Sequence, residues 1–443
     1  MSTKQDPLNV THKAVFTIAI PMGLGYLTTP LVGIADTAIV GQLGQAALIG
    51  GVAVAAAFIG ILLTTFNFLR FATSALTAQA IGRKDGEEVV GVLLRSCLIG
   101  IVAGLLIIAC SPLILKYGLI IMGPSDAVAE AVRDYFNVRI LATPFSLLNF
   151  VFFAWFVGTD RPILSFLTQT FLNVLNITFT YYFVLVKGMG VEGAAWGTVV
   201  AEAVTVLVSI FFVIKPVSKY AGQLFTMTFH LRKLIAMMVL NGDIMVRSFC
   251  LHIAFVFFTR QSAQQSDNIL AANEILLHFF MIAGYFLDGF AVAAEQFVGR
   301  AIGAKDHSTF KRAIRLTAFW NVVQAALLSL VFVIFGSLIV AFMTPNEEIR
   351  VIAAIYLIWA VITPLVGVAA FQMDGVFIGA TWSRDMRNTM IMSLVLMIIA
   401  YYVFFPILGN HGLWLALNIF LGLRGLLLYL RLKSREAATF ATG

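Results

Sequence analysis

The stretch "AVFTIAIPMGLGYLTTPLVGIADTAIV", residues 14–40, holds one carboxylate, Asp36, in an otherwise apolar run. The run exceeds the roughly 20 residues that a helix needs to cross a bilayer. It is too long for the apolar part of a signal peptide and lacks a cleavage site, so we expect it to remain in the mature chain. A charged Asp at the centre of a spanning helix costs about 2.5–3.5 kcal/mol, so its presence requires a functional reason.

The composition extends this reasoning to the whole chain. Of 443 residues, 60% are hydrophobic and 12% are charged, and the mean hydropathy is +0.95. Soluble domains carry about 25% charged residues. We therefore predict an all-α polytopic membrane protein. Its three cysteines have no disulfide or metal-ligand spacing and are expected to be small buried apolar residues.

Runs of about 20 apolar residues predict twelve spanning helices. Their approximate ranges are 14–38, 46–69, 91–111, 134–157, 163–186, 192–214, 235–259, 268–292, 313–343, 351–379, 388–408 and 411–430. With this topology, 20 Lys and Arg lie on the side of the two termini and 6 on the other. The positive-inside rule then places both termini in the cytoplasm. The net charge of +7 is explained by this topology, and we expect no nucleic-acid partner.

Two short motifs recur at one offset, which indicates an internal repeat. "AIGRKDG" at 80–86 returns as "AIGAKDH" at 301–307, and "FVGTDRP" at 156–162 returns as "FIGATWS" at 377–383. Each half has six predicted helices, so the halves share one orientation and should be related by a pseudo-two-fold axis along the membrane normal. The predicted parts are a cytoplasmic N-tail (1–13), a first lobe (14–214), a linker (215–234), a second lobe (235–430) and a cytoplasmic C-tail (431–443).

The fifth predicted span carries a polar stripe, because spacings of three and four residues place its members on one helical face. These residues are Gln169, Asn173, Asn176 and Thr180. Two explanations are open: hydrogen bonds that join helices, or the lining of a polar cavity. The equivalent span of the second half has no such stripe, so the first lobe is the candidate for the substrate cavity.

The second lobe has its own intramembrane charges. Those expected on one face of the eighth span are Glu274, Asp288 and Glu295, along with His278 and Tyr285. Arg247 and Asp374 could pair with members of that set, either as a structural ion-pair network or as an ion or substrate site. Asp243 and Arg247 are four residues apart and could pair with each other. We expect no metal site.

No nucleophile arrangement and no phosphate-binding loop is present, so we expect neither an enzyme nor an ATP-driven pump. An ion gradient remains as the source of energy. No cofactor is then required apart from a coupling ion, H⁺ or Na⁺.

Several strings resemble the MATE (multidrug and toxic compound extrusion) family. They include "DTAIVGQLG" fifteen residues after a Pro, and the repeated "IGRKDG" loop. "NGDIMVRS", "YFLDGFAVAAE" and "LGNHGLWLALNIFLGLRGL" are similar to its DinF branch, the DNA-damage-inducible protein F group. The resemblance covers nearly the whole chain.

The resemblance implies two six-helix lobes and antiport of organic molecules against H⁺ or Na⁺. It implies that Asp36 is the proton site and that the first helix bends at Pro21. Asn176, Thr180 and Thr198 match the polar partners of that site. Many relatives have a second carboxylate where this chain has Thr180. The resemblance therefore leaves Asp36 as the carboxylate that must bind the proton. Asp374 matches an Asp that some relatives use for Na⁺, although Phe377 replaces a common Gln.

We therefore expect a proton-coupled exporter of amphiphilic or cationic drugs and toxic organic compounds, acting by alternating access as a monomer in the bacterial inner membrane. One alternative is a flippase for lipid-linked precursors, which should line its cavity with several basic residues. The basic residues not counted above with the loops and helix ends are Arg70, Arg247 and Arg424. A sodium-coupled exporter and a structural or signalling membrane protein are the two remaining hypotheses.

Overall fold

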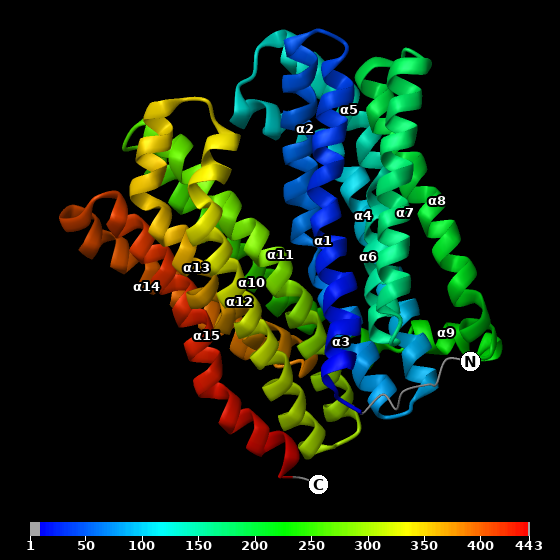
Figure 1. Ribbon diagram of the computed structural model, residues 1–443. Coiled ribbons are helices and arrows are strands. Elements are labelled where there is room, and N and C mark those ends of the chain that lie inside the picture. Colours follow the sequence, from blue (N-terminus) through cyan, green and yellow to red (C-terminus); the bar gives the residue numbers. More distant parts are fainter. Residues whose placement is uncertain (1–8, 442–443) are drawn as a thin grey trace. The chain divides into compact units, whose positions relative to one another are not determined.

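The computed structural model describes residues 9–441, and all regular structure in this range is helical (Figure 1). Residues 1–8 of the predicted N-tail and residues 442–443 of the predicted C-tail lie outside the described residues. The helices are α1 (His12–Gly41), α2 (Ala46–Thr65), α3 (Phe68–Gly82), α4 (Gly86–Met122), α5 (Asp126–Arg139), η1 (Ile140–Ala142), α6 (Thr143–Gly158), α7 (Pro162–Tyr181), η2 (Tyr182–Val186), α8 (Gly190–Ser218), η3 (Ala221–Gln223), α9 (Leu224–Thr228), α10 (Leu231–Ala263), α11 (Asp267–Gly303), α12 (His307–Met343), α13 (Glu347–Gly379), α14 (Ser383–Leu408) and α15 (Asn410–Phe440).

Within the described residues, twelve helical segments are long and apolar enough to span a membrane, which confirms the predicted fold class. The second span is α2 followed by α3, and the fourth joins α5, η1 and α6. Most segments run several residues beyond the predicted limits. The last one continues to Phe440 instead of ending near residue 430, because Glu436 pairs with His307 at 2.6 Å and with Lys311 at 3.4 Å.

The repeated motifs fold in the same way. In the first copy, Lys84 has a φ of 57°, and Asp85 donates its N–H to Ala80 O. In the second, Lys305 has a φ of 55°, and Asp306 donates to Ala301 O. A left-handed residue that ends one helix and leads into the next is a common C-cap. The repeat found in the sequence is therefore a repeat of local structure.

By internal contacts the chain separates into two compact units. One contains the residues up to Leu24 and those from Val239 onward, and the other contains Gly25–Met238. The boundary at the N-terminal side lies inside α1. The beginning of this helix, as far as Leu24, thus groups with residues of the second half of the sequence, whereas the predicted first lobe, 14–214, includes the whole first span.

Each unit has its own core. In the Gly25–Met238 unit, Trp155 of α6 is buried and donates its indole N–H to Val89 O of α4. In the other unit, α13 packs closely on α11. The lack of a side chain at Gly375 permits this approach, since a Cβ atom there would collide with the carbonyl of Ala291. Phe258 and Trp414 are buried in the same unit and pack edge to face.

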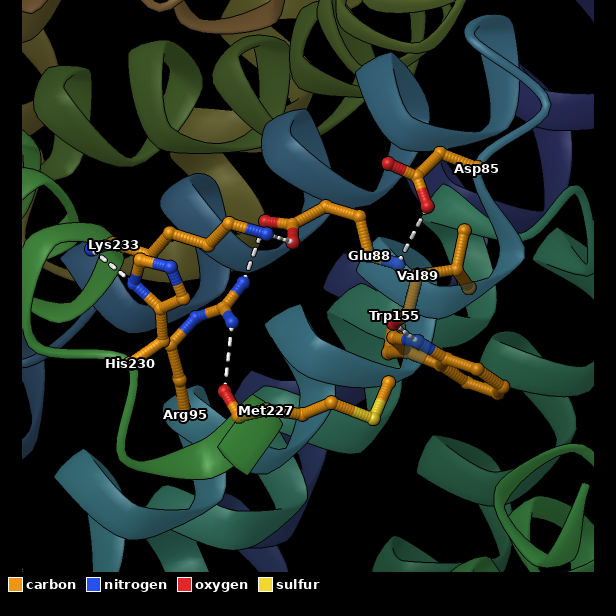
Figure 2. A network of polar contacts seen from close by, with 8 residues as sticks. All are labelled: Asp85, Glu88, Val89, Arg95, Trp155, Met227, His230 and Lys233. Carbon is orange, nitrogen blue, oxygen red and sulfur yellow. Dashed lines mark hydrogen bonds and ion pairs between the residues drawn. The ribbon is translucent and has the colours of Figure 1, made fainter. Parts of the chain in front are cut away.

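A polar network holds the linker against α4 (Figure 2). Asp85 caps α4 by accepting the Glu88 N–H at 2.9 Å. The Glu88 carboxylate accepts from Arg95 and from Lys233, each at 2.6 Å. Arg95 also donates to Met227 O in α9 at 2.9 Å. The predicted linker is thus partly helical and firmly attached to α4.

Candidate functional site

Asp36 lies in the part of α1 that belongs to the Gly25–Met238 unit. Its Oδ1 atom is buried and accepts no hydrogen bond of normal geometry. The Thr180 hydroxyl of α7 faces the carboxylate, and the Arg139 guanidinium of α5 contributes a positive field. Thr180 Oγ1 is also buried without a hydrogen bond of normal geometry. Asp36 is therefore a half-buried acid whose buried Oδ1 atom has open hydrogen-bonding capacity.

The polar stripe on α7 has two parts with different roles. Gln169 donates to Gly25 O at 3.2 Å, and Asn173 donates to Thr28 Oγ1 at 2.7 Å. These two side chains hold α1 against α7, which matches the first explanation of the stripe. Farther along the helix, Asn176 donates to Thr198 Oγ1 of α8 at 2.8 Å. Its Oδ1 atom is buried without a partner, so this end of the stripe keeps a free acceptor.

An ion pair that the sequence analysis did not name includes the Arg139 guanidinium, whose positive field acts on Asp36. Arg139 donates to Glu202 Oε1 of α8 at 3.0 Å, and Ser146 of α6 donates to the other carboxylate oxygen. Asn149 donates to the backbone carbonyl of Glu202 at 3.1 Å. Arg139 and Glu202 are 9% and 6% exposed, so both charges are removed from solvent. We call Asp36, Arg139 and Glu202 the Arg139 cluster.

Tyr135 completes this neighbourhood. It lies one turn before Arg139 on α5, is buried, and interacts with Arg139, Asp36 and Glu202. The sequence analysis named neither Arg139 nor Glu202 as a site residue. The available signal was a second carboxylate, Glu202, in the middle of the sixth span.

In the other unit, Asp374 lies between two arginines. Arg247 of α10 and Arg424 of α15 both donate to its Oδ2 atom, the second at 2.7 Å. All three side chains are buried. The sequence analysis expected Arg247 and Asp374 to pair with charges of the eighth span and did not name their pairing with each other. Asp288 of that span adds a further negative field at Arg424. Two guanidinium groups on one carboxylate leave it poorly suited to bind a cation.

Several other charged residues of the second half have polar partners outside the Asp374 group. Asp243 pairs with Arg387 at 2.7 Å and accepts from Ser383 at 2.8 Å, so the i, i+4 pairing with Arg247 was wrong. Glu274 accepts from Thr259 at 2.8 Å, and Glu295 is buried beside Gln296. In residues 9–441, no three His, Cys, Asp or Glu side chains are grouped as a metal site.

An apolar pocket of about 280 Å³ lies in the unit that contains the second half. It is formed by the beginning of α1 together with α11 and α12, and its lining includes Phe16, Phe290, Trp320 and Gln324. None of the predicted cavity residues of α7 belongs to it. Its apolar walls would suit an apolar or aromatic group.

The comparisons with known proteins agree with this architecture. The family model described as MatE matches residues 21–182 and 244–403, one copy in each half of the sequence. The chain belongs to the MatE family. The DNA damage-inducible protein F of Escherichia coli (strain K12) is 37% identical to it over 95% of this chain and 91% of that protein.

Solved MatE-type structures share the fold. An outward-facing multidrug resistance MATE family transporter of the MOP superfamily has a TM-score of 0.85 at 18% identity, covering 98% of this chain and 97% of that one. A MATE crystal structure in the bent conformation has a TM-score of 0.86 at 19% identity, covering 98% of both chains. The resemblance to this family, its DinF branch and its twelve-helix fold is confirmed, and the chain is a multi-pass membrane transporter of the MatE family.

Proposed function

We propose that this transporter is a proton-coupled antiporter that exports amphiphilic or cationic organic compounds, with Asp36 as its proton site. It works as a monomer in the bacterial inner membrane, with both termini in the cytoplasm. Its partners are small organic substrates and the surrounding lipid, and it needs no cofactor besides the coupling ion. The observation that carries the proposal is the buried, unpartnered Oδ1 atom of Asp36.

The contrast with Asp374 supports a proton site at Asp36. Asp374 is neutralised by Arg247 and Arg424, so protonating it would break two charge-assisted bonds. Asp36 makes no such pair, and an added proton finds a free carboxylate oxygen. Protonation removes the attraction of Asp36 for a cation, which couples proton entry to the release of substrate.

The same geometry favours H⁺ over Na⁺. A hard cation requires several oxygen ligands, and at Asp36 the Thr180 hydroxyl supplies one. In the other unit, both guanidinium groups at Asp374 compete with any cation. A proton moving inward gains about 1.4 kcal/mol per pH unit and about 2.3 kcal/mol per 100 mV.

The test compares Asp36→Asn with Asp126→Asn, which changes an exposed residue in the first turn of α5. Dye efflux is measured in inverted vesicles under a proton gradient alone and under a sodium gradient alone. We expect a proton gradient to drive efflux by the wild type and by Asp126→Asn, and Asp36→Asn to be inactive at equal membrane levels. Efflux by Asp36→Asn near the wild-type rate, or efflux driven by sodium with the proton gradient collapsed, would refute the proposal.

A further inference from the structure

The apolar pocket of about 280 Å³ shares no residue with the Arg139 cluster. Its lining comes from the beginning of α1, from α11 and from α12, and all of it belongs to the unit that contains the second half of the sequence. The Arg139 cluster and the polar stripe of α7 belong to the Gly25–Met238 unit. The proposed function gives this pocket no role, so its own chemistry decides what it can bind.

Aromatic rings from three helices contribute to the lining. Phe16 of α1 packs edge to face on Trp320 of α12, with ring centroids 4.6 Å apart. Phe16 packs in the same way on Phe290 of α11, at 5.7 Å. Rings at these separations and angles attract one another, so the three side chains hold each other in place. The pocket therefore presents a preformed aromatic surface, which favours a flat ring system over a flexible chain.

The backbones of α1 and α11 are held close together beside these rings. A Cβ atom at Gly289 of α11 would lie 2.5 Å from Ala19 O and 3.1 Å from Gly23 N. Ala19 and Gly23 also belong to the lining of the pocket. Because this contact is between backbones, α1 is already as near to α11 as it can come. The pocket is thus not a gap that a small shift of α1 would close.

Gln324 of α12 is the available hydrogen-bonding side chain of the lining. The indole N–H of Trp320 is already donated to His12 Nδ1 at 2.9 Å. Gln324 Oε1 is buried and accepts no hydrogen bond. The last side-chain torsion of Gln has a broad energy profile, so the amide can turn this oxygen toward a ligand. A buried acceptor without a donor is unfavourable, and the pocket therefore favours a ligand that donates one hydrogen bond.

The charge and the size of the pocket narrow the ligand further. Among the residues that line it within 9–441, none is ionisable, so a bound cation would be buried without a counter-charge. Ile20 and Leu327 of the lining are 52% and 57% exposed, which gives an apolar entrance for a molecule dissolved in the bilayer. The volume lies just below the range of about 300–1,000 Å³ that is usual for drug-sized ligands, so it suits two or three fused rings.

We propose that this pocket binds a neutral, bilayer-soluble aromatic compound of two or three rings that carries one hydroxyl or N–H group. The ring system packs against Phe16, Phe290 and Trp320, and its polar group donates to Gln324 Oε1. The inference goes beyond the proposed function, because it assigns a second binding site, in the other unit, to a ligand without charge. Gln324 is the residue that selects for a hydrogen-bond donor.

The ligand test compares 2-naphthol with 2-methoxynaphthalene, which has the same rings but cannot donate a hydrogen bond. Binding to the full chain in lipid nanodiscs is measured by calorimetry, and empty nanodiscs correct for partition into lipid. We expect saturable binding of 2-naphthol, about fivefold tighter than that of 2-methoxynaphthalene. The permanent cation trimethyl(2-naphthyl)ammonium should bind more weakly than both. No saturable binding of 2-naphthol, equal affinity for the two neutral probes, or tightest binding of the cation would overturn the inference.

The variant test separates the hydrogen bond from the space. Gln324→Leu should weaken 2-naphthol binding about fivefold and leave 2-methoxynaphthalene binding unchanged. Val323 lines the pocket, whereas its neighbour Val322 is outside the lining and 51% exposed. Val323→Trp should fill the pocket and abolish saturable 2-naphthol binding, and Val322→Trp, the matched control, should retain it. Equal effects of the two Trp variants, or wild-type 2-naphthol affinity in Gln324→Leu, would overturn the inference.

Folding of each variant is checked by size-exclusion chromatography. If Val323→Trp does not fold, Val323→Phe fills less of the pocket and is compared with Val322→Phe. Asp36→Asn should bind 2-naphthol as the wild type does, and a loss of binding there would place the ligand at Asp36 and overturn the inference. Inactive Asp36→Asn together with no 2-naphthol binding by the wild type would remove only this inference. Active Asp36→Asn with the expected 2-naphthol binding would remove only the proposed function.

Discussion

At the scale of single residues, Asp306 of the repeated motif forms helix-capping hydrogen bonds whose effect on stability can be measured. It caps α12 by accepting the Thr309 N–H at 3.0 Å and the Thr309 hydroxyl at 2.6 Å. These bonds hold the pKa of Asp306 below its ordinary value. A carboxylate with a lowered pKa stabilises the fold above its unfolded pKa of about 3.9, and the stabilisation is lost as the pH falls through the folded value.

We therefore expect Asp306→Ala to lower the free energy of unfolding by about 1 kcal/mol at pH 7. The difference from the wild type should shrink as the pH falls below about 3.9, because the wild-type carboxyl group then becomes protonated. Thermal unfolding in detergent at neutral and acidic pH measures this. Asp306→Asn is the control, since Asn also caps helices but does not titrate. An equal deficit of Asp306→Ala at both pH values would contradict the assignment.

Periodicity along one helix predicted some side-chain contacts and missed others. It placed Gln169 and Asn173 on one face, and both side chains donate hydrogen bonds to α1. The Arg139–Glu202 pair joins residues 63 positions apart, and no periodicity within one helix predicts which side chains meet across two. Asp243 illustrates this too, because its partner, Arg387, lies 144 positions away.

At the scale of elements, the spans were predictable within several residues because their apolar length is set by the bilayer. The short helix α9 was not, since it depends on contacts with α4. Arg95 is 2% exposed and joins Glu88 to Met227 O, whereas the Lys233 side chain is 45% exposed. Arg95 and Lys233, the two basic residues that bind Glu88, should therefore differ greatly in their contribution to the stability of the Gly25–Met238 unit.

We expect Arg95→Ala to destabilise the Gly25–Met238 unit by about 3–5 kcal/mol, because it leaves the Glu88 carboxylate without its buried partner. Lys233→Ala should cost less than about 1 kcal/mol, as a half-exposed ion pair does. Thermal unfolding gives the ranking, and limited proteolysis of residues 219–230 reports whether α9 detaches from α4. Equal stability of the two variants would show that the network does not hold the linker.

At the scale of the whole molecule, two helices pass from one compact unit to the other. α1 changes unit after Leu24 and α10 after Met238. The sequence repeat predicted a boundary between the halves near α10, but it gave no sign of the boundary within α1. That boundary depends on packing: the beginning of α1 fits against Gly289 of α11, and its later part is bonded to α7.

This packing provides a test of whether the beginning of α1 is an integral part of the unit that holds α11. A side chain at Gly289 would lie 2.5 Å from Ala19 O and 3.1 Å from Gly23 N, which are backbone atoms that cannot move aside alone. At Gly284, on the same helix, the nearest atom would be in the Phe371 ring at an ordinary 3.5 Å. Both changes to Ala bring the same gain in helix propensity, so their difference isolates the collision.

We expect Gly289→Ala to lower the free energy of unfolding by about 1–3 kcal/mol relative to Gly284→Ala, as overpacking does. Efflux should fall with it, since α1 also carries Asp36 on its later part. Thermal unfolding and dye efflux at equal membrane levels measure both effects. If the beginning of α1 were only loosely attached, it would shift away from α11 at little cost, and the two variants would unfold at the same temperature.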